Sequence, residues 1–182
     1  MDLPQPVIEL DAHLTLRQFD GEADLAEFCQ VIEESLEHLR PWMPWVADHS
    51  PAFTADFLTQ LPGRWANGTE HTYAVVLDGA IVGACSLFRR DETPAGAREI
   101  GYWLHPAATG GGIATRAAGA MVEQAFRLPG VECVEIVTDP GNLPSAAVPT
   151  RLGFTVDRRR PAERVAPAET GEELFWRLTR DQ

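Results

Sequence analysis

Two different periods of hydrophobic positions mark the N-terminal part of the chain. Around residues 14–17 leucine alternates with polar residues, which is typical of a short half-buried strand. Between residues 25 and 39 apolar residues recur every three to four positions, so we expect an amphipathic helix that ends before the next proline. A second helix toward Trp65 is predicted to begin near Ser50 or Thr54, either of which suits an N-terminal cap.

The pattern after residue 70 predicts strands in alternation with two further helices. Alternating residues 73–77 and 81–88 flank Asp78-Gly79, a dipeptide typical of a two-residue hairpin turn. The remaining predicted strands are 98–105, 131–138, 154–160 and 173–179, and the remaining predicted helices are 114–125 and 144–152.

This order, β-α-α-β-β-β-α-β-α-β-β, indicates fold class α/β (α+β), with a mixed, mostly antiparallel twisted sheet flanked by helices. The sequence contains no repeat and no Pro/Gly/Ser-rich linker. We therefore expect one domain over residues 1–182, with its core at about 14–179.

Composition excludes several classes of protein. The 182 residues are 45% hydrophobic and 23% charged, which is usual for a folded domain and argues against disorder. A net charge of −12 disfavours a nucleic-acid partner, because such proteins need a basic face. No stretch reaches the ~18 apolar residues of a membrane span. Cys29, Cys85 and Cys133 are widely spaced, so neither a metal site nor a disulfide framework is expected, and without a signal peptide we expect a cytoplasmic protein.

A glycine-rich junction between a predicted strand and a predicted helix is the main candidate for chemistry. Glycines there can adopt positive φ and point several N–H groups the same way, and the helix N-terminus adds further donors, so the segment suits a phosphate or pyrophosphate. No Lys-Ser/Thr follows the last glycine, which excludes a P-loop, and the third glycine of a dinucleotide fingerprint is replaced by threonine. Taken alone, the segment also fits a tight turn without a ligand. It comprises Thr109, Gly110, Gly111, Gly112, Ile113, Ala114 and Thr115.

Four segments in one order resemble the GNAT N-acetyltransferase superfamily, within it the branch of ribosomal-protein N-terminal acetyltransferases. Thr109, Gly112 and Ala114 occupy the defining positions of that family's pyrophosphate loop. The other segments are Leu39-Arg40-Pro41-Trp42, the strand Glu99-Ile100-Gly101-Tyr102-Trp103-Leu104, and the helix bounded by Asn142-Leu143-Pro144-Ser145 and Leu152-Gly153-Phe154.

The resemblance implies that acetyl-CoA, or another acyl-CoA, is the co-substrate and that no metal is needed. It places the co-substrate on the 109–115 loop, beside Trp103 and Leu104 on a strand that splays from its neighbour, with Asn142 and Ser145 nearby. Two departures weaken the match. Thr109 stands where Arg or Gln is usual and Gly111 where Lys or Arg is frequent, so either coenzyme A binds more weakly or Arg116 supplies the missing charge. Pro149 should bend the helix that carries Ser145.

The resemblance also implies direct attack of an amine on the thioester in a ternary complex. Glu99 is the expected base, with Glu163 as a weaker candidate. Ser145 is the expected proton donor to the leaving thiolate, with Tyr102 as the alternative. At pH 7 deprotonation costs an α-amine about 1 kcal/mol and a lysine about 4.6 kcal/mol, so a modest base favours an α-amine.

We expect the acceptor to be the N-terminal α-amine of a protein or peptide, held in a pocket walled by Trp42 and Trp45. A small-molecule amine acetyltransferase and a non-catalytic acyl-CoA sensor both stay open as alternatives. A homodimer through an edge strand near the C-terminus also stays open.

Overall fold

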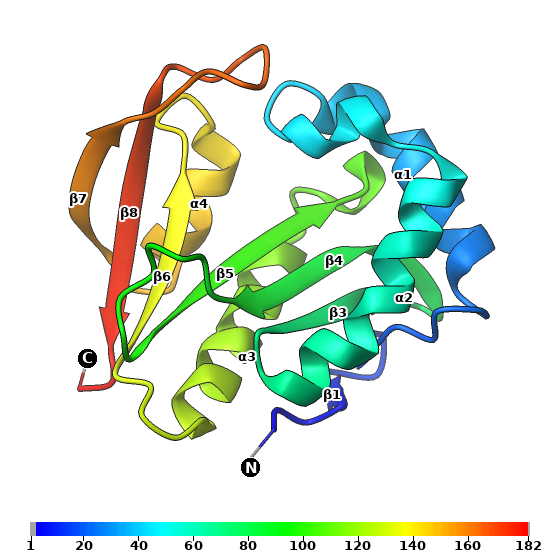
Figure 1. Ribbon diagram of the computed structural model, residues 1–182, viewed down its shortest axis with the longest axis horizontal. Coiled ribbons are helices and arrows are strands. Elements are labelled where there is room, and N and C mark those ends of the chain that lie inside the picture. The colour runs from blue at the N-terminus through cyan, green and yellow to red at the C-terminus, as the bar shows by residue number, and fades with distance from the viewer. Residues whose placement is uncertain (1–2, 182) are drawn as a thin grey trace.

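The computed structural model describes residues 3–181 and is built on one continuous twisted sheet (Figure 1). Within that range eight strands are paired in the order β1-β2-β3-β4-β5-β6-β8-β7. Neighbouring strands are antiparallel except β5 and β6, which are parallel. The strands are Val7–Glu9 (β1), Leu14–Gln18 (β2), Glu70–Leu77 (β3), Ala80–Phe88 (β4), Ala97–Leu104 (β5), Cys133–Thr138 (β6), Thr155–Pro161 (β7) and Glu172–Thr179 (β8).

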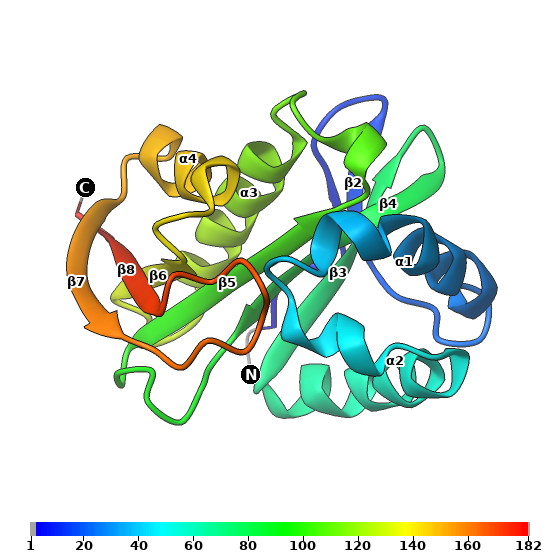
Figure 2. The same ribbon diagram turned by 90° about the horizontal axis from the view of Figure 1, so that it is seen from above.

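Helices cover both faces of this sheet, and each face has its own core (Figure 2). One pair of helices packs on β3 and β4 through residues such as Phe28 and Leu58, and the other pair packs on the opposite face through residues such as Met121 and Val148. The first pair is α1 (Leu25–Leu39) and α2 (Pro51–Asn67); the second is α3 (Ile113–Arg127) and α4 (Leu143–Arg151). Two short 3-10 turns, Pro44–Asp48 and Pro106–Ala108, complete the set of helical elements.

The predicted mixed α/β architecture is confirmed, and most boundaries agree to within three residues. Ser50 is the cap of α2, since its hydroxyl accepts a hydrogen bond from the Phe53 N–H. Asp78 and Gly79 have φ values of 49° and 83°, as the predicted hairpin turn requires. Strand β1 was not predicted, because three residues are too few to show alternation; backbone pairing with β2 defines it.

Strands β5 and β6 begin side by side and then separate (Figure 1). They are paired only between residues 97–100 and 133–136, whereas β5 stays paired with β4 as far as Leu104. The His105 N–H donates to the Val82 carbonyl on β4. Because backbone groups alternate sides along a strand, the N–H groups of Tyr102 and Leu104 point toward the gap. The sheet therefore offers backbone donors where the two strands separate, as the sequence predicted.

A buried histidine lies in the core on the α3 face. His71 is 1% exposed, and its ring packs edge-on against Trp65 with 4.9 Å between centroids. Burial and the nearby Arg98 guanidinium lower the pKa of His71 to about 4, because both disfavour the imidazolium. His71 is therefore neutral in the folded protein over the physiological pH range.

This neutrality predicts a pH dependence of stability. His71 has its ordinary pKa in the unfolded chain, so the unfolded state binds more protons between pH 6.5 and 4, and stability falls as the pH drops through that window. We expect this group to contribute a loss of up to about 3 kcal/mol at pH 4. Urea unfolding at several pH values gives the free energy of unfolding as a function of pH. His71→Phe should make this dependence flatter between pH 6.5 and 4, and an unchanged dependence would contradict the conclusion that His71 is neutral in the folded protein.

Candidate active site

The glycine-rich loop, the end of β5 and helix α4 together line a cavity of about 490 Å³, here called the loop cavity. All the residues predicted to hold the co-substrate line it except Gly111, and Tyr102 and Trp42 line it as well. The cavity lies beside the gap between β5 and β6, so the structure brings the four sequence segments of the resemblance together at one place.

Backbone N–H groups of the loop are available to a ligand. Gly110 and Gly112 have φ values of 79° and 76°, and Gly112 precedes the first residue of α3 without any capping side chain. Within residues 3–181 no acceptor is recorded for the N–H groups of Gly110–Gly112. The N–H groups of 113–115 belong to the first helical turn and have no intrahelical partner. No heavy atom lies within 4 Å of a Cβ placed at any of the three glycines, so the loop fits an anion such as a pyrophosphate.

The cation beside this loop is not the one that the sequence predicted. Arg116 donates to Asp11 over 2.7 Å and does not line the loop cavity, so the expectation that it supplies the missing charge is not met. Arg151, in the last turn of α4, lines the cavity instead. Sequence spacing could not identify Arg151, because the direction in which α4 faces depends on tertiary packing.

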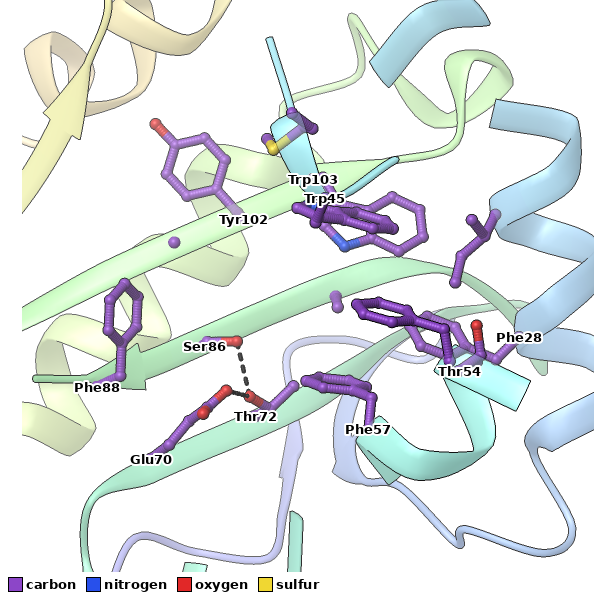
Figure 3. A pocket seen from close by; sticks show the side chains of 15 residues that line it. Phe28, Trp45, Thr54, Phe57, Glu70, Thr72, Ser86, Phe88, Tyr102 and Trp103 are labelled. Carbon is purple, nitrogen blue, oxygen red and sulfur yellow. Dashed lines mark hydrogen bonds between the residues drawn. The ribbon is translucent and has the colours of Figure 1, made fainter. Parts of the chain in front are cut away.

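A second cavity of about 440 Å³, the aromatic cavity, lies between α1, α2 and strands β3–β5 (Figure 3). Its wall is mainly aromatic, and Trp45 and Trp103 lie together in it with 5.9 Å between ring centroids. A polar group of Glu70, Thr72 and Ser86 forms part of its floor. Sequence reasoning had not singled out these three residues, since each reads as an ordinary position of a strand.

A third cavity of about 210 Å³, the acidic cavity, lies under the loop between β7 and β8. That loop is tied to the segment before Trp42, because the Ala168 N–H donates to the Pro41 carbonyl. Among the lining carboxylates, Glu163 is exposed and has no recorded ion pair or hydrogen bond within the described chain, unlike the other four. The lining carboxylates are Asp139, Glu163, Glu169, Glu172 and Glu173.

The three cavities meet around Met43, Tyr102 and Ser145, and this place is here called the junction. Met43 lines all three. Tyr102 joins the loop cavity to the aromatic cavity, while Ser145 and Trp42 join the loop cavity to the acidic cavity. The two predicted acceptor-side tryptophans are thus divided, Trp45 in the aromatic cavity and Trp42 in the other two.

A proline determines how Tyr102 and Ser145 meet. Pro149 has no N–H to donate to the Ser145 carbonyl one turn before it. The Tyr102 hydroxyl donates to that carbonyl over 2.9 Å, and its oxygen lies 3.5 Å from Ser145 Oγ. Burial raises the pKa of Tyr102 to about 12, so this hydroxyl keeps its proton. Tyr102 therefore anchors α4. Ser145 is the residue of this pair that lines both the loop cavity and the acidic cavity.

Asn142 is the N-cap of α4 and lies next to the junction. Its side-chain oxygen accepts from the Ser145 N–H at 3.3 Å, so it caps the helix, and the same residue lines the loop and acidic cavities.

The two candidate bases have different surroundings. Glu99 is buried, lines none of the three cavities, and binds the Arg90 guanidinium through both carboxylate oxygens at 2.7 and 2.9 Å. Burial raises the pKa of Glu99, and Arg90 opposes that rise. Glu163 instead lines the acidic cavity together with Ser145. The structure thus places the weaker sequence candidate, and not Glu99, next to the junction.

Residues 3–181 contain no cluster of three or more His, Cys, Asp or Glu side chains arranged to hold a metal ion. In the same range no helix combines the length and apolar character needed to cross a membrane.

Comparisons with known proteins identify the family. A model described as "Acetyltransferase (GNAT) domain" matches residues 13–155. The chain is 28% identical over 148 residues to YdaF of Bacillus subtilis (strain 168), provisionally named a ribosomal N-acetyltransferase, with 80% of each chain covered. Its fold is similar to that of RimL, a ribosomal L7/L12 alpha-N-protein acetyltransferase solved with coenzyme A, with a TM-score of 0.86 and 19% identity over 95% of this chain and 97% of that one. It is also similar to Mycobacterium smegmatis RimJ, with a TM-score of 0.83 and 24% identity over 99% and 88%. The chain therefore belongs to the GNAT acetyltransferase family.

Proposed function

We propose that this acetyltransferase transfers an acetyl group from acetyl-CoA to the N-terminal α-amine of a protein or peptide. The convergence of the loop, aromatic and acidic cavities at Tyr102 and Ser145 carries the proposal. It provides separate places for an anionic co-substrate and for an acceptor, with one point of contact between them. Relatives named for ribosomal-protein acetylation support the choice of acceptor.

The residues around the loop cavity would hold acetyl-CoA, which supplies the activated thioester. The N–H groups of Gly110–Thr115 would bind its pyrophosphate, and Arg151 would add the positive charge that the loop lacks. The Leu104 N–H, which points into the gap between β5 and β6, is positioned to donate to the thioester oxygen. One such donor can contribute about 3 kcal/mol to stabilising the transition state.

The acidic cavity favours a cationic acceptor. Three of the lining carboxylates, Asp139, Glu163 and Glu169, have no recorded arginine partner within the described chain and raise the local concentration of a protonated amine, and the net charge of −12 acts in the same direction. Glu163 would accept the proton as the amine attacks, directly or through water, and Ser145 Oγ would donate a hydrogen bond to the departing sulfur.

Release of free thiol from acetyl-CoA, with peptides differing only at the terminus, tests this function. We expect turnover of a lysine-containing peptide whose N-terminal α-amine is free. We expect little turnover of the same peptide when that α-amine is already acetylated. Turnover of small amines without turnover of peptides would support the alternative, a small-molecule acetyltransferase. Tight binding of acetyl-CoA without turnover of any amine would contradict the proposal and support a sensor.

The role of Glu163 leads to a separate prediction. Glu163→Gln should lower kcat/KM at pH 7 about 100-fold, because the variant loses a general base. The loss of kcat/KM relative to the wild type should become smaller toward pH 9, because the acceptor α-amine is already neutral there. Steady-state rates from pH 6 to pH 9 with one peptide measure both effects.

Glu99→Gln is the matched control for this experiment. It removes one partner of the buried Arg90 pair, so it should lower the free energy of unfolding while leaving the pH profile of kcat/KM unchanged. Loss of the pH dependence in Glu99→Gln, with a normal profile in Glu163→Gln, would restore Glu99 as the base.

A further inference from the structure

Acetylation of an amine does not by itself require the aromatic cavity. Its side chains are predominantly large and apolar, and its volume of about 440 Å³ lies within the range of small-molecule binding sites. Aromatic rings from α1, α2, the 3-10 turn Pro44–Asp48 and the sheet line the cavity (Figure 3). They belong to Phe28, Trp45, Phe53, Phe57, Phe88, Tyr102 and Trp103. A cavity of this kind binds an aromatic or bulky apolar group far better than it binds a methyl or hydroxymethyl group.

The polar part of the floor has a fixed hydrogen-bond direction. Glu70 accepts from the Arg64 guanidinium at one oxygen and from the Thr72 hydroxyl at the other, at 2.7 and 2.6 Å. Thr72 has thus used its only proton, so it must accept in its 2.8 Å contact with Ser86. The Ser86 hydroxyl is therefore a donor to Thr72, and its remaining capacity is that of an acceptor. A ligand that meets Ser86 in the cavity must donate a hydrogen bond to it.

The distance from the junction to Ser86 limits the size of the ligand. Ser86 on β4 is paired with Gly101 on β5, and Tyr102, the next residue, lies at the junction. The gap beside β5 and the Ser86 hydroxyl are thus separated by one to two strand spacings, about 5–10 Å. Gly101 has no side chain, and a Cβ there would come within 3.2 Å of the Phe88 ring, so Phe88 packs directly over the Gly101 backbone and forms the wall of the cavity at this point.

From these observations we infer that the acceptor is an arylalkyl amine. Its ring lies in the aromatic cavity and carries a group that donates a hydrogen bond to Ser86, as a phenol or an indole does. This inference rests on the proposed function and specifies its acceptor as a peptide that begins with tyrosine or tryptophan. A free arylethylamine offers the same chemistry and would correspond to the small-molecule alternative. In either case the amine reaches the junction while the ring occupies the cavity.

The test compares acceptors that differ by one group at a time. With free amines, kcat/KM should rise about 30-fold or more from propylamine to 2-phenylethylamine, because a ring is buried. It should rise roughly fivefold again from 2-phenylethylamine to tyramine, because Ser86 gains a donor. A parallel set of peptides beginning with alanine, phenylalanine and tyrosine distinguishes the two sources.

Two variants test the role of Ser86 itself. Ser86→Ala should bring the ratio of kcat/KM for tyramine over 2-phenylethylamine close to one, with the KM for acetyl-CoA unchanged, because this hydroxyl is placed to contact the acceptor and not acetyl-CoA. Ser35→Ala is the matched control. It also removes a serine hydroxyl, but that hydroxyl is buried, donates to the Val31 carbonyl within α1 and does not line the cavity, so the ratio should stay as in the wild type.

The outcomes separate this inference from the proposed function. Peptides beginning with alanine that react as fast as those beginning with tyrosine would overturn the inference and leave the function standing. A tyramine preference that persists in Ser86→Ala would overturn the role of the polar floor. Absence of turnover with every amine, despite bound acetyl-CoA, would instead remove the proposed function.

Discussion

The double substitution Gly110→Ala and Gly112→Ala is expected to weaken acetyl-CoA binding by about 30-fold or more. Both glycines have positive φ, where an added Cβ costs roughly 1–2 kcal/mol per residue in the loop conformation. The new methyl groups would also occupy the open space beside the loop that a pyrophosphate needs. Isothermal titration calorimetry with acetyl-CoA measures the effect.

Gly68 provides a control with the same backbone geometry. It ends α2 with a φ of 74°, and nothing lies within 4 Å of a Cβ placed there, but it does not line the loop cavity. Gly68→Ala should therefore destabilise the fold by about 1 kcal/mol and leave the affinity for acetyl-CoA unchanged. Equal losses of affinity in both variants, or none in the loop variant, would contradict a role of the loop in binding.

The second large effect is expected from Tyr102→Phe. Removing the hydroxyl leaves the Ser145 carbonyl without a donor, because residue 149 is proline, and this should lower the free energy of unfolding by about 1–3 kcal/mol. Ser145 also loses the contact that fixes its position at the junction, so kcat should fall about tenfold or more while the KM for acetyl-CoA changes little. Urea unfolding and steady-state kinetics give the two numbers.

Pro149→Ala completes a double-mutant cycle with Tyr102→Phe. Alanine restores an N–H that can donate to the Ser145 carbonyl within the helix, so Tyr102→Phe should cost clearly less stability in this background than in the wild type. Equal costs in the two backgrounds would show that the proline and the tyrosine act independently.

The sequence predicted the elements well because hydrophobic periods and turn residues are local signals. Ser50, Asp78-Gly79 and the glycines of the loop each define a boundary through their own backbone chemistry. The family resemblance identified most of the residues that line the loop cavity, because they lie in four short segments with characteristic spacing.

The charged residues of the site were harder to predict, because their roles depend on partners distant in sequence. Glu99 is paired with Arg90 across a turn, and Arg116 is paired with Asp11, which precedes it by 105 residues. Neither pairing leaves a trace in local periodicity. The orientation of Arg151 and the hydrogen-bond direction at Ser86 likewise follow only from tertiary packing.

The arrangement of acetyl-CoA at the junction is the central claim, and a crystal structure of the complex tests it most directly. We predict pyrophosphate oxygens within hydrogen-bond distance, about 3 Å, of the N–H groups of Gly110–Thr115. We also predict that the sulfur lies between β5 and β6, next to Ser145 and Tyr102. A complex in which the diphosphate contacts other residues, or in which the sulfur lies outside the gap, would contradict it.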